Sequence, residues 1–245
     1  MSDPGRMSSA PVARQFVLDV TLPEGSDFEG FHPGANALAL DGLRDLARGR
    51  GELQIYVYGE TGTGKTHLLQ AVCHEAAQRG RRAAYLPRVL LAGAGARSLD
   101  GLDALDVVCL DGIGALCGST EGETALFNLI NSARARGTQL VLSDRQSPRA
   151  LSAGLSDLAS RLVWGPVFQL VPMEDDAKCA LLVAWARRRG FELPREVAEY
   201  LLMTCPRDLP SLLEQLQRLE RESLGQQRRV TLPFARAVMR AREGA

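Results

Sequence analysis

A chain of 245 residues is long enough to bury a sizeable core, as one α/β domain or as a domain and a half. Hydrophobic residues make up 45% and charged residues 24%, the proportions of an ordinary globular protein. The 29 Lys and Arg residues balance the 29 Asp and Glu residues, which excludes a global positive field of the kind that attracts nucleic acid or anionic membranes.

Five cysteines, at positions 73, 109, 117, 179 and 205, lie mostly in apolar runs and form no C-x-x-C pair. We therefore expect reduced, buried thiols in a cytoplasmic protein, and neither a disulfide framework nor a zinc site. No stretch is apolar enough for a membrane span, and the first residues lack the apolar core of a signal peptide. Residues 1–14 are small and polar, which predicts a disordered tail.

In chain order, the hydrophobic spacing predicts strands that alternate with helices, a pattern typical of a mostly parallel sheet with helices on both faces. Leu38, Leu43 and Leu46 mark the first helix, and β-branched or apolar runs mark five strands. The expected elements are a helix over 34–49, strands at 54–58, 82–86, 106–111, 139–144 and 167–171, and helices after residue 66, over 121–136 and over 156–161.

Beyond Pro172 the strands stop and only helical patterns follow. The third of four expected helices is marked by a leucine series from Leu209 to Leu219, and Thr231 with Pro233 reads as the start of the fourth. We therefore predict an α/β domain over residues 15–172 and a small all-helical domain over 173–245.

A phosphate-binding loop follows the first expected strand. Its residues are Gly59, Glu60, Thr61, Gly62, Thr63, Gly64, Lys65 and Thr66, a complete G-x-x-x-x-G-K-T pattern. The glycines let successive N–H groups face one concave site, Lys65 brings a cation to the phosphates, and the Thr66 hydroxyl is suited to Mg²⁺. The alternative is a glycine-rich turn with an incidental lysine, which the strand before the loop and the helical pattern after it disfavour.

A carboxylate at the end of a neighbouring buried strand is the second requirement of such a site, and Asp111 fits it. Many related ATPases carry another acid directly after this position, but here the next residue is Gly112. We therefore expect tight nucleotide binding with slow hydrolysis. Ser143 and Asp144 end the strand expected between the other two, where polar groups can face the γ-phosphate, although a polar strand end explains them as well.

Together these features resemble the AAA+ ATPases, specifically the DnaA-related proteins and, within these, the Hda regulators (DnaA regulatory inactivators). The likeness runs from about Gln15 to the end of the chain. Its most specific stretches are Phe28–Asn36, Leu142–Arg145, Ser160–Gly165 and Arg189–Pro194. Many Hda proteins have a degraded phosphate loop, whereas this one is intact, so the resemblance implies ADP or ATP with Mg²⁺ as the ligand.

The resemblance also implies roles for single residues. The arginine matching Arg161 is a finger that acts in trans on a neighbouring subunit's nucleotide, although a cation at a helix end also suits the helix dipole. Arg207 matches the second sensor, Ser143 and Asp144 match the first, and Asn36 lies on the adenine side. A clamp-binding motif matches Gln15, Phe16, Val17 and Leu18, a pattern that an edge strand explains equally well.

The function implied is regulation of DNA replication initiation: the protein docks on the sliding clamp and stimulates hydrolysis of ATP bound to the DnaA initiator, which prevents re-initiation. The expected partners are DnaA and the sliding clamp, with a homo-oligomer as a further possible assembly and no sequence-specific DNA binding. One alternative is a self-acting AAA+ ATPase, such as a helicase loader or transposition helper. Another is a small-molecule kinase, for which the sequence offers no recognisable acceptor pocket.

Overall fold

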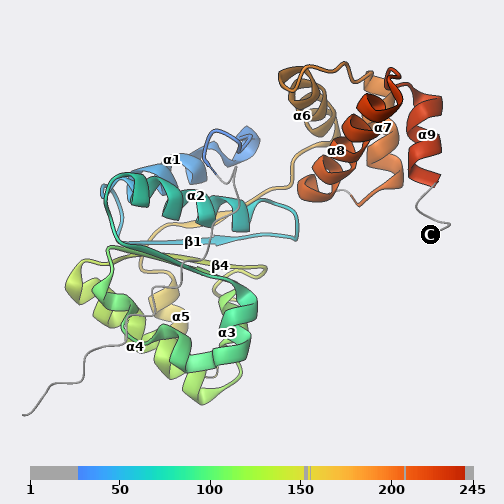
Figure 1. The fold of residues 1–245 in the computed structure, drawn as a ribbon. Helices are drawn as coiled ribbons and strands as arrows, with labels where there is room; N and C mark the ends of the chain where they lie inside the picture. Colours follow the sequence, from blue (N-terminus) through green and yellow to red (C-terminus); the bar gives the residue numbers. More distant parts are fainter. Residues whose placement is uncertain (1–26, 152–153, 155, 207, 241–245) are drawn as a thin grey trace, which may run out of the picture.

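The computed structural model describes residues 27–151, 154, 156–206 and 208–240. The segment Gln15–Leu18 and Arg207, both singled out from the sequence, lie outside these residues. Five strands and nine α-helices make up the described fold (Figure 1). In chain order they are α1 (Ala37–Ala47), β1 (Gln54–Tyr58), α2 (Lys65–Gln78), β2 (Ala83–Leu86), α3 (Arg88–Ala94), β3 (Val107–Asp111), α4 (Thr120–Arg136), β4 (Gln139–Asp144), α5 (Ser156–Leu162), β5 (Val167–Gln169), α6 (Asp175–Arg188), α7 (Arg195–Thr204), α8 (Leu209–Gln226) and α9 (Leu232–Arg240).

All five strands run parallel in one sheet with the order β2-β3-β4-β1-β5. The sequence-based prediction of a five-stranded parallel sheet is confirmed, and so is the place of β4 between β1 and β3. The register sets Asp111 opposite Ser143 and Tyr58 opposite Asp144. The polar ends of β3 and β4 therefore meet at one edge of the sheet, beside the loop that leaves β1.

Each face of the sheet packs on its own group of helices (Figure 1). On one face, α1 and α2 bury Leu43, Leu46 and Leu69, and on the other α4 buries Leu126 and Ile130. The predicted first helix is confirmed, but Leu38 is 78% exposed and does not belong to its core face. That face is formed instead by Ala39, Leu40, Leu43, Leu46 and Ala47.

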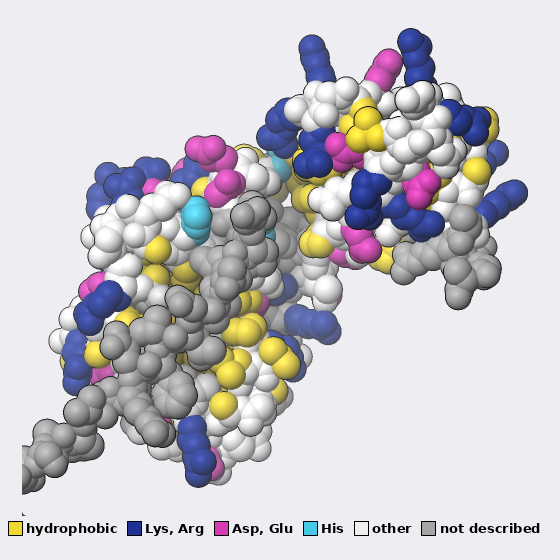
Figure 2. All heavy atoms as spheres, in the orientation of Figure 1, with side chains coloured by type: hydrophobic (Ala, Val, Ile, Leu, Met, Phe, Trp, Pro, Cys, Tyr) yellow, Lys and Arg dark blue, Asp and Glu magenta, His cyan; other side chains and the backbone are white. Residues whose placement is uncertain are grey.

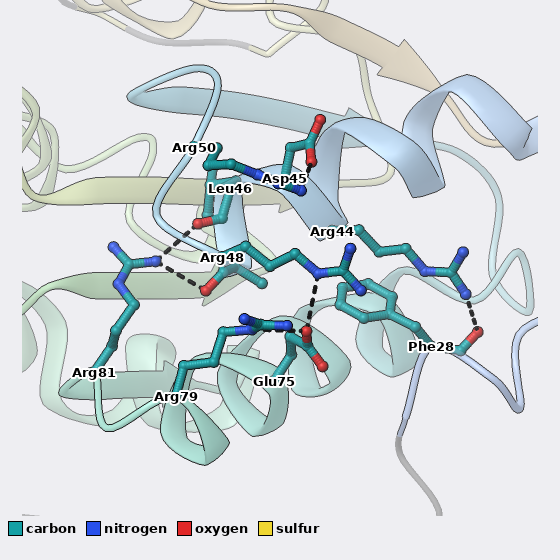
Figure 3. A network of polar contacts seen from close by, with 10 residues as sticks. Phe28, Arg44, Asp45, Leu46, Arg48, Arg50, Glu75, Arg79 and Arg81 are labelled. Atoms are coloured by element: carbon teal, nitrogen blue, oxygen red, sulfur yellow. Dashed lines mark hydrogen bonds and ion pairs between the residues drawn. The ribbon is translucent and has the colours of Figure 1, made fainter.

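An arginine network joins the end of α1 to α2 and to the segment after α2 (Figure 3). Arg81 Nη1 donates to the carbonyls of Leu46 and Ala47 at 2.8 and 2.9 Å, which satisfies the free end of α1. Its Nη2 donates to Gln139 Oε1 at 2.6 Å, at the start of β4. One side chain thus fixes a helix end against the edge of the sheet far from the phosphate loop.

The last four helices, α6 to α9, pack around a hydrophobic core of their own. We call this group of helices the lid. They lie to one side of the sheet in Figure 1. Leu182, Leu201, Leu216 and Phe234 are at most 3% exposed in this core. Among the described residues, no helix has both the length and the apolar character needed to cross a bilayer.

Candidate nucleotide site

The phosphate loop connects β1 to α2 in a form that requires glycine. A Cβ at Gly59 would stand 2.4 Å from the carbonyl oxygen of Leu170, a backbone atom that cannot move aside. Gly64 precedes the first residue of α2 with a φ of +92°, a conformation that residues with a side chain rarely adopt. The loop therefore ends at the N-terminus of α2, where backbone N–H groups and the helix dipole favour an anion.

The Lys65 ammonium lies within the curl of this loop. It donates to the carbonyl oxygens of Gly59 and Glu60 at 2.6 and 2.8 Å. Partial burial lowers the pKa of Lys65, and the nearby Asp111 carboxylate opposes that shift. The charge is thus presented at the loop itself, where phosphate oxygens can replace the carbonyls as partners.

The Asp111 carboxylate accepts hydrogen bonds from three hydroxyl groups. Thr66 Oγ1 and the Tyr85 hydroxyl donate to its Oδ2 at 2.6 and 2.9 Å, and Ser143 Oγ donates to its Oδ1 at 2.6 Å. Burial together with the Asp111 carboxylate raises the pKa of Tyr85, which keeps its phenol a donor. The structure therefore brings Thr66, Asp111 and Ser143 together, as the sequence predicts, and adds Tyr85, which sequence reasoning missed.

Asp144 lies at the end of β4 and is 6% exposed. Its Oδ2 accepts from the Gly114 amide at 2.7 Å, and its Oδ1 accepts from the amides of Arg145 and Gln146 at 2.7 and 3.3 Å. Asp144 borders the pocket described below, whereas the side chain of Ser143 is fully buried behind Asp111. The two polar residues therefore have different tasks: one shapes the loop after β4, and the other orients the carboxylate of β3.

A pocket of about 1060 Å³ extends from the phosphate loop to the lid. Lys65, Asp111 and Asp144 line one end, and Phe31, Asn36 and the lid residue Trp185 are among the side chains that line the rest. A Cβ at Gly62 would stand 3.3 Å from Cβ of Asp208, so the start of α8 lies directly over the loop. The volume falls at the upper end of the range for ligand pockets in proteins.

Asn36 connects two walls of this pocket. Its Nδ2 donates to the carbonyl of Val171 at 3.0 Å, and its Oδ1 accepts from the Val171 amide at 2.8 Å. Both ends of the side-chain amide are therefore used within the chain. Asn36 borders the pocket and holds the chain that leaves β5 next to the start of α1.

The residues present fit a magnesium nucleotide. Thr66 and Asp111 supply a hydroxyl and a carboxylate oxygen 2.6 Å apart, the hard oxygen donors that Mg²⁺ takes while keeping most of its waters. When bound, the ion would neutralise charge on the phosphates. The glycine loop supplies N–H groups for the phosphates themselves.

Arg161 lies apart from this site, and the described residues that line the pocket do not include it. The sequence suggests an exposed arginine near the end of a short helix, and α5 does end at Leu162. The guanidinium, however, is partly enclosed: Nε donates to Asn131 Oδ1 at 3.2 Å, and its carbon lies 4.4 Å from the ring centroid of Trp164 and 5.2 Å from that of Phe127.

Comparison with protein families matches the lid and the first part of the α/β domain. Residues 175–239 match the model of the Hda lid domain, and residues 22–89 match that of the bacterial DnaA ATPase domain. The crystal structure of domain III of DnaA from Thermotoga maritima is 25% identical, with a TM-score of 0.73 over 90% of this chain and 98% of that one.

The chain is an Hda-like, DnaA-related AAA+ protein.

Two further structures extend the comparison of this AAA+ protein. DnaA from Aquifex aeolicus bound to AMPPCP is 26% identical, with a TM-score of 0.70 over 81% of this chain and 66% of that one. RuvB from Thermotoga maritima, at 18% identity and a TM-score of 0.64 over 88% of this chain and 72% of that one, shares the fold. The chain thus spans about two thirds of the Aquifex DnaA chain. The AAA+ family to which the chain belongs consists of ATPases that bind nucleotide.

Two basic clusters bear on the alternative of a DNA-gripping ATPase. Lys and Arg side chains project from several places on the lid (Figure 2). In the cluster at 187–189, Arg189 stacks on Trp185 at 4.8 Å and pairs with Glu220 at 2.8 Å. In the cluster at 228–229, Arg228 lies 5.7 Å from the Phe234 ring. Each cluster therefore has an aromatic neighbour, Trp185 or Phe234, against which an arginine of the same chain packs.

Proposed function

We propose that this protein is a nucleotide-dependent regulator of replication initiation that stimulates hydrolysis of ATP held by the DnaA initiator. Membership in the Hda-like group supports DnaA as the partner. The single observation that carries the proposal is the Thr66–Asp111 pair beside an intact glycine loop, beneath a lid of the Hda type. ADP or ATP with Mg²⁺ binds there and orders the lid, residues 173–245, against the α/β domain, residues 15–172.

In this proposal the protein's own nucleotide is structural, and Arg161 is the group offered to DnaA. A guanidinium at the transferring phosphate is typically worth ~10³–10⁵ in rate. The Arg161 side chain is held by Asn131 and two aromatic rings and forms no ion pair among the described residues, so its charge is available to a partner. Gln15–Leu18 supplies the contact with the sliding clamp, and Arg207, which precedes Asp208 in the sequence, supplies the second sensor.

The decisive experiment is single-turnover hydrolysis of ATP by DnaA in the presence of loaded clamp and this protein. Arg161→Ala is expected to abolish stimulation while leaving ADP affinity unchanged. Arg134→Ala is the matched control, because its guanidinium carbon lies 4.7 Å from the same Trp164 ring, on the neighbouring helix α4. Stimulation that survives Arg161→Ala, or that fails equally with Arg134→Ala, would contradict the finger assignment.

A self-acting ATPase is the second candidate, and the intact loop with Asp111 favours it. Gly112 weighs against it, since that position offers no side chain to activate water. Steady-state ATP turnover by the purified protein separates the two: we expect hydrolysis slower than nucleotide exchange, and rapid turnover without DnaA would favour the second candidate.

A further inference from the structure

Arg88 is a cation that the site described above does not yet use. It is the first residue of α3, directly after β2, and it borders the same pocket as Lys65 and Asp111. Its side chain is 63% exposed, and its Nη1 lies 4.0 Å from Asp144 Oδ2. That oxygen already accepts a hydrogen bond of 2.7 Å from Gly114, so the ion pair is long and leaves the guanidinium free to take another acceptor.

The stem of Arg88 covers Gly112. A Cβ at Gly112 would stand 2.9 Å from Cβ and 3.1 Å from Cγ of Arg88, and the φ of Gly112 is +82°. An acidic side chain therefore has no room at this position, beside Asp111. A second acid here would add negative charge next to the phosphates. This chain instead has the Cβ and Cγ atoms of Arg88, whose guanidinium lies at the same end of the pocket.

The two carboxylates nearest Arg88 at that end of the pocket already have partners. Lys65, Arg88 and Arg145 border the pocket, as do Asp111 and Asp144, and Asp208 lies over the loop at Gly62. Both oxygens of Asp111 and of Asp144 accept hydrogen bonds from hydroxyl or amide groups of the protein. The exposed Arg88 guanidinium, held only by a long ion pair, is therefore available to a phosphate group that enters here.

We propose that Arg88 binds the terminal phosphate of a nucleoside triphosphate, so that this site favours a triphosphate over a diphosphate. The inference rests on the proposed nucleotide site. A guanidinium matches phosphate oxygens with two parallel donors, and a γ-phosphate brings further charge and acceptors that a diphosphate lacks in that place. Because the group beside Gly112 is a cation and not a base, it stabilises bound triphosphate without activating water.

Calorimetric titration of the full chain with ADP and with the non-hydrolysable analogue AMPPCP, both with Mg²⁺, tests this inference. Arg88→Gln is expected to weaken AMPPCP binding about tenfold and ADP binding less than twofold. Arg88→Lys, which keeps the charge but not the paired donors, is expected to fall between. Arg82→Gln is the matched control: Arg82 stands at the other end of β2, is 67% exposed, and pairs with Asp106 at 3.5 Å.

The outcomes separate this inference from the proposed function. Wild-type protein that binds neither nucleotide would overturn both. Wild-type protein that binds both, with an AMPPCP-to-ADP affinity ratio unchanged by Arg88→Gln, would overturn the inference alone, and so would an equal shift from Arg82→Gln. Thermal melting of each variant without ligand shows whether it folds. If Arg88→Gln does not fold, the AMPPCP-to-ADP affinity ratio of Arg88→Lys is compared with that of the wild type instead.

Discussion

The guanidinium carbon of Arg161 lies 4.4 Å from the ring centroid of Trp164, three residues along the chain. Phe127 and Asn131, one helical turn apart on α4, contact the same guanidinium from another element. Aromatic rings attract a cation without neutralising it. The arrangement therefore limits the rotamers of Arg161 while preserving the full charge that a finger would carry.

Trp164→Leu is expected to lower stimulation of DnaA about tenfold, because a loosely held guanidinium spends less time in the reactive orientation. ADP affinity is expected to stay unchanged, since Trp164 does not border the pocket described above. Single-turnover hydrolysis at saturating protein measures the first effect, and calorimetry the second. Trp164→Phe, which keeps a ring, is expected to retain most of the stimulation. In an Arg161→Ala background, Trp164→Leu should cause no further loss of stimulation. An additive loss would contradict the positioning role of Trp164.

Asp111→Asn is expected to remove the benefit of Mg²⁺ for ATP binding. The amide keeps the size of the side chain but loses the charge that holds the ion, so affinity in Mg²⁺ falls by about tenfold while affinity in EDTA is unchanged. Titration of a fluorescent ATP analogue under both conditions measures this. Asp106→Asn, just before the same strand, is the control and should leave the Mg²⁺ effect intact.

Gly165→Ala is expected to destabilise the fold by about 2–3 kcal/mol, because its Cβ would stand 1.8 Å from the carbonyl oxygen of Gln54. The corresponding fall in Tm is about 5–10 °C. Gly225→Ala is the matched control: it lies inside α8 with nothing within 4 Å of the added carbon, and should stabilise by about 0.5–1 kcal/mol. Thermal melts that move in the same direction for both substitutions would refute the close-approach argument.

Glu75 links stability to pH through the network in Figure 3. Hydrogen bonds from Arg48 and then Arg79 hold the pKa of Glu75 below its usual value. A lowered folded-state pKa means stabilisation that is present above the unfolded value of about 4.3 and is lost as the pH falls through the folded value. Glu75→Gln should therefore cost about 0.5–1 kcal/mol at pH 7 and nothing at pH 2.

Denaturant melts at the two pH values measure this difference. Asp45→Asn is the control, because the Asp45–Arg50 pair is more exposed, at 52% and 63% for the two side chains, and is expected to cost less. If Glu75→Gln lowers the free energy of unfolding equally at pH 2 and pH 7, the substitution acts through packing and not through charge.

The sheet and the centre of the site could be predicted because their signals are local. A strand, a glycine loop and a helix follow one another within residues 54–78, and Asp111 and Ser143 each end an apolar run. Since parallel strands end at a common edge, the sequence alone implies that these groups meet, and the register of β3 against β4 confirms it.

The parts that were missed depend on contacts between distant segments. No helix was predicted over α3, whose short apolar run is interrupted by Gly93 and closed by Gly95, so Arg88 had no predicted place. Tyr85 lies in a short strand, and its role follows only from the pairing of β2 with β3. The enclosure of Arg161 comes from α4, about 30 residues earlier in the chain.

The side chain of Asn36 substitutes for a neighbouring strand next to Val171, because it offers one donor and one acceptor to the backbone of that residue. An aspartate of equal size could satisfy only the Val171 amide and would set its charge against the facing carbonyl oxygen. The wall ahead of α1 and the connector leading toward α6 are thereby tied together, so a displacement of either is transmitted to the other.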